Sequence, residues 1–318
     1  MFFTPIDFRQ LPETRLAMAA RLSIPLSALP LTHGAGPGNG GRYGDHREAG
    51  VVMVARTNWE DLPEATKRTV EQHTGRVWSA RTVSTGMNSA VAAVLTTERG
   101  TVFVKGLQRD YRRRWTQDME AMINPHVAHL SPRLLWRVQD EWDLLGFESV
   151  DGRHADYGPG SADLPQIAHT VATLGEIACP DLPVKVATHR WREYVDAPEE
   201  LQWLAGDRLL HTDYNPLNVL IASGRALLID WAWATRGAGW IDCACLIVRL
   251  VADGHRAVSA EAVVQEVPAW RTAPAEGLTV FSRISLRMWQ EVADGDASDW
   301  TQRMARAATE WAAHRTRI

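Results

Sequence analysis

The stretch from Leu209 to Ala232, LLHTDYNPLNVLIASGRALLIDWA, constrains the fold more than any other part of the chain. Two short apolar runs, NVLIA and ALLID, flank a Ser-Gly-Arg sequence that is typical of a tight turn between antiparallel strands. We therefore expect a β-hairpin here. Pairing of its strands brings Asn218, at the start of the first run, beside Asp230, at the end of the second. The polar side chains thus lie at the open end of the hairpin.

The spacing of the polar residues in this stretch suits phosphoryl transfer. Asn218 follows Asp213 by five residues, and Asp230 follows Asn218 by twelve. An amide oxygen beside a carboxylate is a hard-oxygen site for Mg²⁺. Asp213 lies on the loop before this pair, where it can accept the proton of an incoming hydroxyl. Taken singly, the residues have plainer interpretations, with His211 as a hydrogen-bonded structural histidine and Asp230 as a cap at a strand end.

The predicted elements divide the chain into a β-rich part and a helical part. The first part is a helix from Trp59 to Gly75, followed by strands over 76–84, 90–97 and 101–107, a helix over 112–124 ended by Pro125, and a hairpin over 132–150 with its turn at 139–141. Beyond Gly152 we expect helices over 162–177, 190–204, 240–253, 259–267, 278–294 and 299–315, with β structure only in the opening stretch. This pattern predicts an α+β fold, with an N-lobe over 53–148 and a helical C-lobe over 149–318.

The first fifty residues differ from the rest of the chain. The segment THGAGPGNGGRYGDHREAG is rich in glycine and nearly free of large apolar residues, so we expect residues 1–52 to form a flexible extension. A helical piece before it resembles half of a helix-turn-helix but has no recognition helix. Folded-looking sequence begins at Met53, and we hypothesise that translation naturally starts there. The intact mass of the protein from its native host tests this.

The whole constellation resembles the aminoglycoside phosphotransferase family, the small-molecule kinase branch of the protein-kinase-like superfamily. HTDYNPLNVLI is similar to that family's H-x-D-x-x-P-x-N loop, with Pro216 at the proline, and a Trp-Ala pair replaces the Phe-Gly of protein kinases. GAGWIDCACL resembles the family's G-x-P-x-x-D segment, with Asp242 at the aspartate. Trp240 and Cys243 depart from the family's usual residues.

The resemblance implies a bilobal protein-kinase-like fold that uses ATP as phosphoryl donor and Mg²⁺ as cofactor. It implies that Asp213 is catalytic and that Asn218 and Asp230 hold the metal. It also implies that His211 and Asp242 support the catalytic loop, since the family's histidine packs against this loop and its aspartate braces the loop backbone.

A lysine and a loop of the β-rich part are candidates for nucleotide binding. Lys105 shares a strand face with Phe103, where an ammonium costs free energy unless it meets an anion or reaches solvent at the strand end. The resemblance implies that Lys105 binds ATP phosphates and pairs with Glu120 rather than Asp118; the plainer interpretation of Glu120 is an exposed helix residue. Further candidates lie in the loop VSTGMNSAV, which also reads as an ordinary turn, and in the hinge LLGFESVDG. They are Ser84, Thr85, Gly86, Asn88, Ser89, Glu148 and Val150.

Composition excludes several classes of protein. The chain has 34 basic and 38 acidic residues, and its net charge of -4 does not fit a nucleic-acid-binding protein. No apolar run is long enough to span a membrane. The 3 cysteines are too few for a disulfide framework, which favours a reducing cytoplasm.

The sequence as a whole predicts an ATP- and Mg²⁺-dependent O-phosphotransferase that acts on a hydroxyl of a small molecule. An aminoglycoside-like or other antibiotic is one candidate acceptor, which would make the protein a resistance enzyme. The alternatives are a metabolic kinase of the choline or homoserine type and a pseudokinase-like nucleotide-binding module, against which the filled metal and base positions argue. A cationic acceptor needs acidic partners, and no spacing selects among Asp156, Asp163, Glu199, Glu200 and Asp294.

Overall fold

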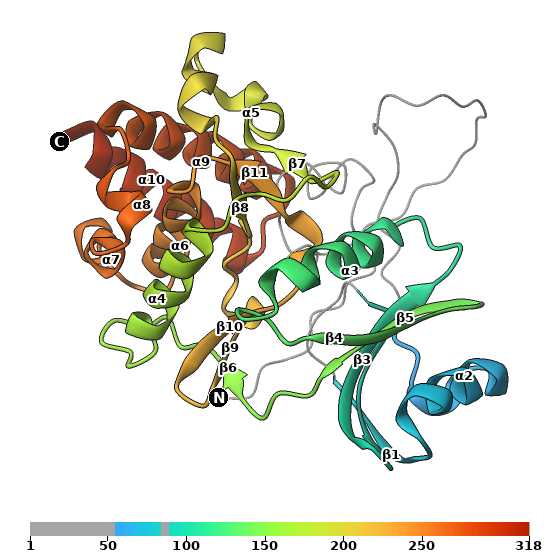
Figure 1. Ribbon diagram of the computed structural model, residues 1–318. Helices are drawn as coiled ribbons and strands as arrows, with labels where there is room; N and C mark the ends of the chain where they lie inside the picture. Colours follow the sequence, from blue (N-terminus) through green and yellow to red (C-terminus); the bar gives the residue numbers. More distant parts are fainter. Residues whose placement is uncertain (1–54, 84–88, 318) are drawn as a thin grey trace, which may run out of the picture.

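The computed structural model describes residues 55–83 and 89–317. The predictions for residues 1–52 and for Ser84, Thr85, Gly86 and Asn88 lie outside the described residues. Figure 1 shows a β-rich N-terminal part joined to a larger helical part, so the predicted α+β fold class is confirmed. We refer to residues 55–148 as the N-lobe and to residues 149–317 as the C-lobe, following the predicted boundary.

The N-lobe is built on one antiparallel sheet of five strands in the order β1-β2-β3-β5-β4. The strands are β1 (Val77–Thr82), β2 (Val91–Thr97), β3 (Gly100–Gln108), β4 (Leu134–Gln139) and β5 (Trp142–Glu148). Helix α2 (Glu64–Thr74) follows a short 3₁₀ turn, η2 (Trp59–Asp61), and ends at Gly75, whose φ of 69° suits glycine. The predicted strands, hairpin turn and first helix are therefore confirmed.

The apolar residues of the N-lobe belong to two different cores. Val91, Leu95, Val104 and Leu144 lie in a cluster between the sheet and α2. Helix α3 (Trp115–Val127) instead turns its apolar residues, among them Ile123, into the large core of the C-lobe. Figure 1 shows α3 between the sheet and the helical part. This helix therefore ties the two lobes together.

Gly146 of β5 lies where only a glycine fits against the neighbouring strand. A Cβ atom at this position would lie 2.2 Å from the ring of Trp136 on β4. Trp136 in turn stacks on His73 of α2, with ring centroids 5.6 Å apart. We expect Gly146→Ala to lower the free energy of unfolding by about 1–3 kcal/mol, because the ring must move. Urea denaturation measures this.

Gly175 provides the matched control for that substitution. It ends helix α4 (Leu164–Gly175), and a Cβ atom added there would lie at an ordinary 3.5 Å from the Cβ of Ala269. Gly175→Ala should leave stability unchanged or raise it slightly. Equal stability of the Gly146→Ala protein and the wild type would contradict the proposed close packing.

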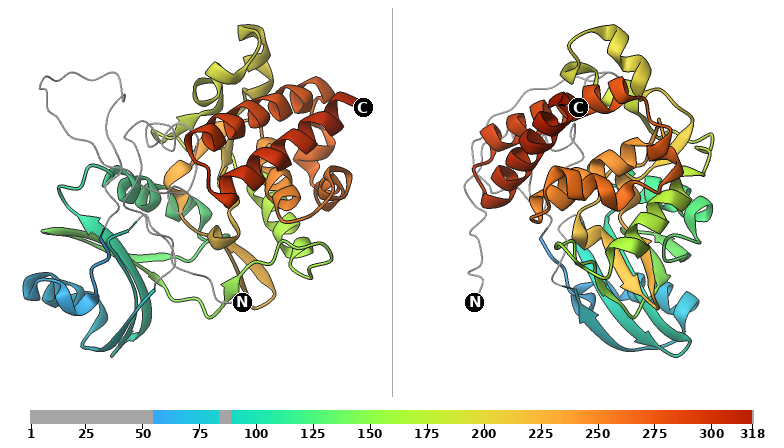
Figure 2. Two further views of the ribbon diagram at one scale, coloured as in Figure 1. Left: turned by 180° about the vertical axis from the view of Figure 1, so that it is seen from behind. Right: turned by 90° about the vertical axis from the view of Figure 1, so that its left-hand side faces the viewer.

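The C-lobe is mostly helical and carries two small sheets. Its longer helices are α4, α6 (Ile241–Ala252), α7 (Ala257–Val264), α9 (Ala275–Gly295) and α10 (Asp299–Arg317). Figure 2 shows α9 and α10 side by side, and both pack against α6. One small sheet joins β10 (Arg225–Leu228), β9 (Val219–Ala222) and β6 (Arg153–His154), and the other joins β7 (Lys185–Val186), β11 (Thr235–Gly237) and β8 (Arg208–Leu210).

Three expectations about local structure were wrong. The predicted helix over 190–204 is broken into α5 (Ala187–Arg190), η3 (Arg192–Tyr194) and η4 (Pro198–Leu204), because Pro198 forces the preceding residue into an extended conformation. Helix α3 continues past Pro125, since a proline in the last turn removes only one hydrogen bond. The β structure of the C-lobe is not confined to the opening stretch, because β6, β7 and β11 lie outside it. These strands, like the helix α8 (Pro268–Arg271), are too brief to show a periodic pattern.

Among the described residues, no helix is long and apolar enough to cross a membrane.

Candidate active site

The predicted hairpin is confirmed and brings the two candidate metal ligands to one end. Strands β9 and β10 pair in register from Ala222 with Arg225 to Val219 with Leu228, around a two-residue turn at positive φ. The pairing extends one step further, since the N–H of Ile229 donates to the carbonyl of Asn218 at 2.9 Å. Asn218 and Asp230 therefore leave adjacent strands at the same end of the hairpin.

Asp213 is held at both of its carboxylate oxygens. The Nδ2 of Asn218 donates to Oδ2 at 2.9 Å, and a guanidinium nitrogen of Arg249 donates to Oδ1 at 3.2 Å. The residue is only 1% exposed. Burial raises the pKa of Asp213 to about 6, although the positive charge of Arg249 opposes that shift. With its amide nitrogen facing Asp213, Asn218 has its Oδ1 on the side away from that carboxylate.

His211 is a neutral, structural histidine that connects the two strands of the site. Its Nε2 donates to the carbonyl of Ile229 at 3.0 Å, and its Nδ1 accepts from the N–H of Asp213 at 3.3 Å. The ring packs edge-on against Trp231, with centroids 4.7 Å apart. Burial lowers the pKa of His211 to about 4, so the ring carries no charge near neutral pH. His211 thus ties the loop before Asp213 to the strand before Asp230.

Asp242, at the start of α6, accepts two hydrogen bonds from the loop backbone. They come from the N–H groups of His211 at 2.9 Å and Thr212 at 2.8 Å. Thr212 has a φ of 66°, which is unfavourable for a β-branched residue. The loop therefore holds a strained residue directly before Asp213, and Asp242 is one of the groups that stabilises it.

Removing the Asp242 carboxylate should destabilise the fold as well as the loop. Asp242→Ala leaves two buried N–H donors without their acceptor, at a cost of about 1–3 kcal/mol for each. Asp242→Asn keeps one acceptor oxygen and should lose less. Urea denaturation of the two variants gives the comparison, and an alanine variant as stable as the wild type would contradict this bracing role.

Lys105, Glu120 and Asp230 form a charge cluster between the lobes, in which Glu120 is buried and the other two are half-buried. The ammonium of Lys105 lies 2.6 Å from a carboxylate oxygen of Glu120 on α3 and 3.7 Å from one of Asp230. Burial acts to lower the pKa of Lys105, but the two carboxylates outweigh it and raise that pKa. The structure therefore brings Lys105 and Glu120 together, and it places both beside a candidate metal ligand. Asp118, the other carboxylate considered, pairs instead with Arg114 and Arg137.

The remaining nucleotide candidates are partly engaged with the protein itself. Ser89 is buried, and its carbonyl accepts from Arg56 at 2.8 Å. Glu148 ends β5, where its N–H donates to the carbonyl of Arg133 at 2.9 Å and its carboxylate pairs with the same arginine. The N–H of Glu148 is therefore taken by the sheet. Val150 follows in the connector between the lobes.

Two arginines at the site were missed by sequence reasoning. Arg249 lies two helical turns after Asp242, so a charged residue on the same face of an apolar helix was the available signal. Arg190 donates to the hydroxyls of Thr212 at 2.8 Å and Thr235 at 2.7 Å. No comparable signal marked Arg190, because its contacts are made by residues distant in the sequence.

Three of the acidic residues considered for a cationic acceptor are engaged within the protein. Asp163 forms two hydrogen bonds with Arg153, and Glu200 pairs with Arg283. Asp156 accepts the N–H of Gly158 in its own loop. The other two, Glu199 and Asp294, are exposed.

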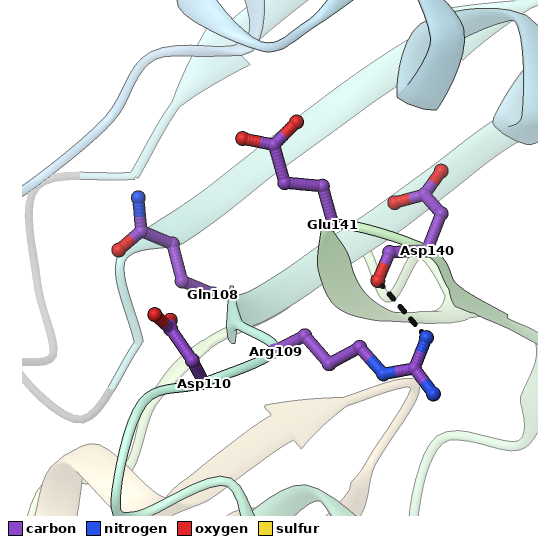
Figure 3. A pocket seen from close by; sticks show the side chains of 5 residues that line it. All are labelled: Gln108, Arg109, Asp110, Asp140 and Glu141. Carbon is purple, nitrogen blue, oxygen red and sulfur yellow. Dashed lines mark hydrogen bonds between the residues drawn. The ribbon is translucent and has the colours of Figure 1, made fainter.

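A surface pocket of about 330 Å³ lies elsewhere, in the N-lobe. Figure 3 shows its lining residues, Gln108, Arg109, Asp110, Asp140 and Glu141, where β3 ends and β4 turns into β5. This is the end of β5 opposite Glu148. Arg109 reaches across to the carbonyl of Asp140. The pocket is therefore separate from the hairpin site.

Solved structures identify the fold of the chain. No family model and no curated protein matches the sequence. A putative aminoglycoside phosphotransferase from Ralstonia eutropha is similar over 80% of this chain and 98% of its own, with a TM-score of 0.54 and 14% identity. An aminoglycoside phosphotransferase from Alicyclobacillus acidocaldarius is similar over 87% of this chain and 98% of its own, with a TM-score of 0.53 and 15% identity.

A third similar structure is the choline kinase LicA of Streptococcus pneumoniae. It matches 79% of this chain and 98% of its own, with a TM-score of 0.52 and 13% identity. The chain therefore has the protein-kinase-like fold of small-molecule phosphotransferases, as the sequence resemblance implied. More narrowly, its fold is shared by aminoglycoside phosphotransferases and a choline kinase, and at these identities the likeness concerns the fold alone.

Proposed function

We propose that this protein is an ATP- and Mg²⁺-dependent O-phosphotransferase that acts on a hydroxyl group of a small molecule. The observation that carries the proposal is the continuous set of contacts from Asp213 through Asn218 to the hairpin end, and from Asp230 to Lys105. A base, two oxygen ligands and a lysine are the parts that phosphoryl transfer requires.

Asp213 acts on the acceptor in this proposal. A carboxylate oxygen has two acceptor sites, so hydrogen bonds from Asn218 and Arg249 leave capacity for the acceptor hydroxyl. Asp213 orients this hydroxyl and takes its proton as the new O–P bond forms and the bond from phosphorus to the leaving ADP oxygen breaks. The acceptor becomes a phosphate ester, and the proton is later released to solvent.

The nucleotide and its metal are assigned to the hairpin end and Lys105. The donor set fits Mg²⁺, because Asn218 and Asp230 offer hard amide and carboxylate oxygens. Bound Mg²⁺ would neutralise charge on the phosphates. Lys105, held by Glu120 at 2.6 Å, binds the ATP phosphates. Val150 and the carbonyl of Glu148 are proposed to meet the adenine, and Ser84, Thr85, Gly86, Asn88 and Ser89 the phosphates. The choline kinase with this fold has also been solved with AMP, which supports the use of a nucleotide.

The acceptor class is the open part of the proposal. Aminoglycoside phosphotransferases and a choline kinase share the fold, so hydroxylated amines are the first acceptors to test. Of the five acids considered for a polycationic antibiotic, Asp163 and Glu200 are paired with arginines. An antibiotic acceptor would make the protein a resistance enzyme, and a metabolic alcohol would make it a metabolic kinase.

Purified protein incubated with Mg·ATP and a panel of acceptors tests the function. The panel contains aminoglycosides, peptide antibiotics, amino alcohols including choline and homoserine, and neutral sugars. Formation of a phosphate ester, detected by mass spectrometry and dependent on Mg²⁺, is the expected result. Binding of Mg·ATP without transfer to any acceptor would instead favour a pseudokinase-like nucleotide-binding module.

A further inference from the structure

Arg249 occupies an unusual place for an arginine, because it lies inside the helical core of the C-lobe. Its side chain is 6% exposed, and that of its partner Asp213 is 2% exposed. No other ion pair among the described residues is as enclosed on both sides. A buried ion pair is weak evidence for stability, since apolar residues of similar size often serve as well. Stability alone therefore does not explain why an arginine lies at this position.

Two tryptophans hold the guanidinium of Arg249. Its Cζ atom lies 5.3 Å from the ring centroid of Trp289 on α9 and 5.1 Å from that of Trp300 on α10. The two rings lie 5.3 Å apart and nearly perpendicular to each other. A further guanidinium nitrogen lies 3.6 Å from the sulfur of Met304, which is a weak acceptor. Within the described part of the chain, the carboxylate of Asp213 is thus the one strong acceptor that the guanidinium contacts.

The contact with Arg249 completes the restraint of the Asp213 carboxylate. Asn218 holds Oδ2 and Arg249 holds Oδ1, so the plane of the carboxylate cannot turn without breaking one of these bonds. Asn218 is itself assigned to the metal and lies on the hairpin. Arg249 belongs to α6 and is fixed by α9 and α10, which Figure 2 shows as a packed pair.

We propose that Arg249, held against the paired rings of Trp289 and Trp300, is a positioning residue that fixes the Asp213 carboxylate for the acceptor hydroxyl. The proposal rests on the phosphotransferase function given above. It assigns the C-terminal helix pair a role in the reaction, because α9 and α10 supply the aromatic rings that set the guanidinium. A misplacement of about 1 Å at a reacting group costs about 10²-fold in rate.

Arg249→Ala and Arg249→Lys, compared with the wild type, test the proposal. Three quantities are measured: Mg·AMP-PNP affinity by calorimetry, ADP formation from Mg·ATP with water as acceptor, and thermal unfolding. We expect Arg249→Ala to lower kcat by about 10²-fold and to change the Mg·AMP-PNP dissociation constant less than about threefold, since the nucleotide ligands are untouched. Arg249→Lys keeps the charge but not the planar stacking, and should recover part of the rate.

Arg315→Ala is the matched control. Arg315 also forms an enclosed ion pair, with Glu261, with side-chain exposures of 10% and 15%, but it does not contact the catalytic loop. The Arg315→Ala protein should be less stable than the wild type but should keep the wild-type kcat. A similar fall in kcat for Arg315→Ala and Arg249→Ala would mean that any buried arginine matters equally, and would overturn the proposal.

Rescue of the Arg249→Ala rate by an added guanidinium compound distinguishes a positioning role from a merely structural one, because a structural role predicts no rescue. Millimolar methylguanidinium should bind against the two tryptophans, in the place of the missing side chain, and restore part of the rate, whereas urea at the same concentration should not. Trp300→Phe, which keeps an aromatic ring, should retain more activity than Trp300→Ala. Wild-type kcat in Arg249→Ala, or loss of kcat that tracks loss of Mg·AMP-PNP binding, would overturn the proposal.

A crystal structure of Arg249→Ala separates this proposal from the proposed function. If the wild type shows no turnover at all, the proposed phosphotransferase function is wrong. The position of the Asp213 side chain in the variant still tests the clamp. A shifted or doubled Asp213 conformation is expected, and an unchanged one would count against a positioning role.

Discussion

Replacement of Asp213 by asparagine is expected to slow phosphoryl transfer by about 10²- to 10⁴-fold, because the amide cannot take the proton of the acceptor hydroxyl. The substitution preserves shape, and its amide oxygen can still accept from Arg249. Mg·ATP affinity should therefore change little, so the loss should appear in kcat. Initial rates with the acceptor found in the panel, together with calorimetry of Mg·ATP, measure both quantities.

Asp213→Ala adds a second effect to the first. It removes the carboxylate and leaves the guanidinium of Arg249 buried without its anion, which costs about 3–5 kcal/mol of stability. A larger fall in the unfolding temperature is thus expected for the alanine variant than for the asparagine variant, because the amide oxygen of the asparagine still gives Arg249 a neutral acceptor. Asp207→Asn, at an exposed side chain, serves as the control. Transfer that persists at the wild-type rate in Asp213→Ala would contradict the assigned mechanism.

Replacement of Asp230 by asparagine is expected to abolish the Mg²⁺-dependent part of nucleotide binding while the fold survives. Asp230 has a φ of 64°, and asparagine is among the few residues that tolerate this left-handed conformation. The change therefore removes the charge and keeps the backbone. Mutation of a residue that only hydrogen-bonds a metal ligand typically lowers metal affinity by about 10–100-fold. For loss of the ligand itself we therefore expect metal affinity to fall by at least about 10²-fold.

Calorimetry with Mg·ATP and with ATP in excess EDTA isolates the metal-dependent part. Chelation should weaken binding to the wild type and leave the Asp230→Asn protein nearly unaffected. Glu120→Gln is the informative comparison, since it removes the other carboxylate near Lys105 while both proposed metal ligands, Asn218 and Asp230, stay in the chain. An Asp230→Asn protein that still binds ATP more tightly with Mg²⁺ than with EDTA would exclude Asp230 as the metal ligand.

Local sequence patterns predicted the hairpin and the residues on it correctly. The apolar runs that flank Ser223 and Gly224 specify two paired strands, and the pairing alone determines that Asn218 and Asp230 leave the same end. The alternation along β3 likewise placed Lys105 on a face where it needs an anion. These features depend on residues close together in the chain, so their geometry follows from strand periodicity.

Other errors and omissions have a common physical origin. The helix predicted over 190–204 was wrong because Pro198 breaks the pattern. Arg190 and Arg249 were overlooked because their partners come from segments more than twenty residues away. The pairing of Glu200 with Arg283 was equally hidden, since it depends on how α9 packs against η4.

The sequence by itself determined the fold class, the order of the lobes and the set of polar groups at the hairpin, because short-range periodicity and turn chemistry encode them. Only the tertiary structure decided how those groups are restrained. Asp213 is held by Asn218 and by an arginine that packs against two tryptophans of the C-terminal helices, and Thr212 is held in a strained conformation by Asp242. These restraints join segments far apart in the chain, and packing of the helical core brings them into contact.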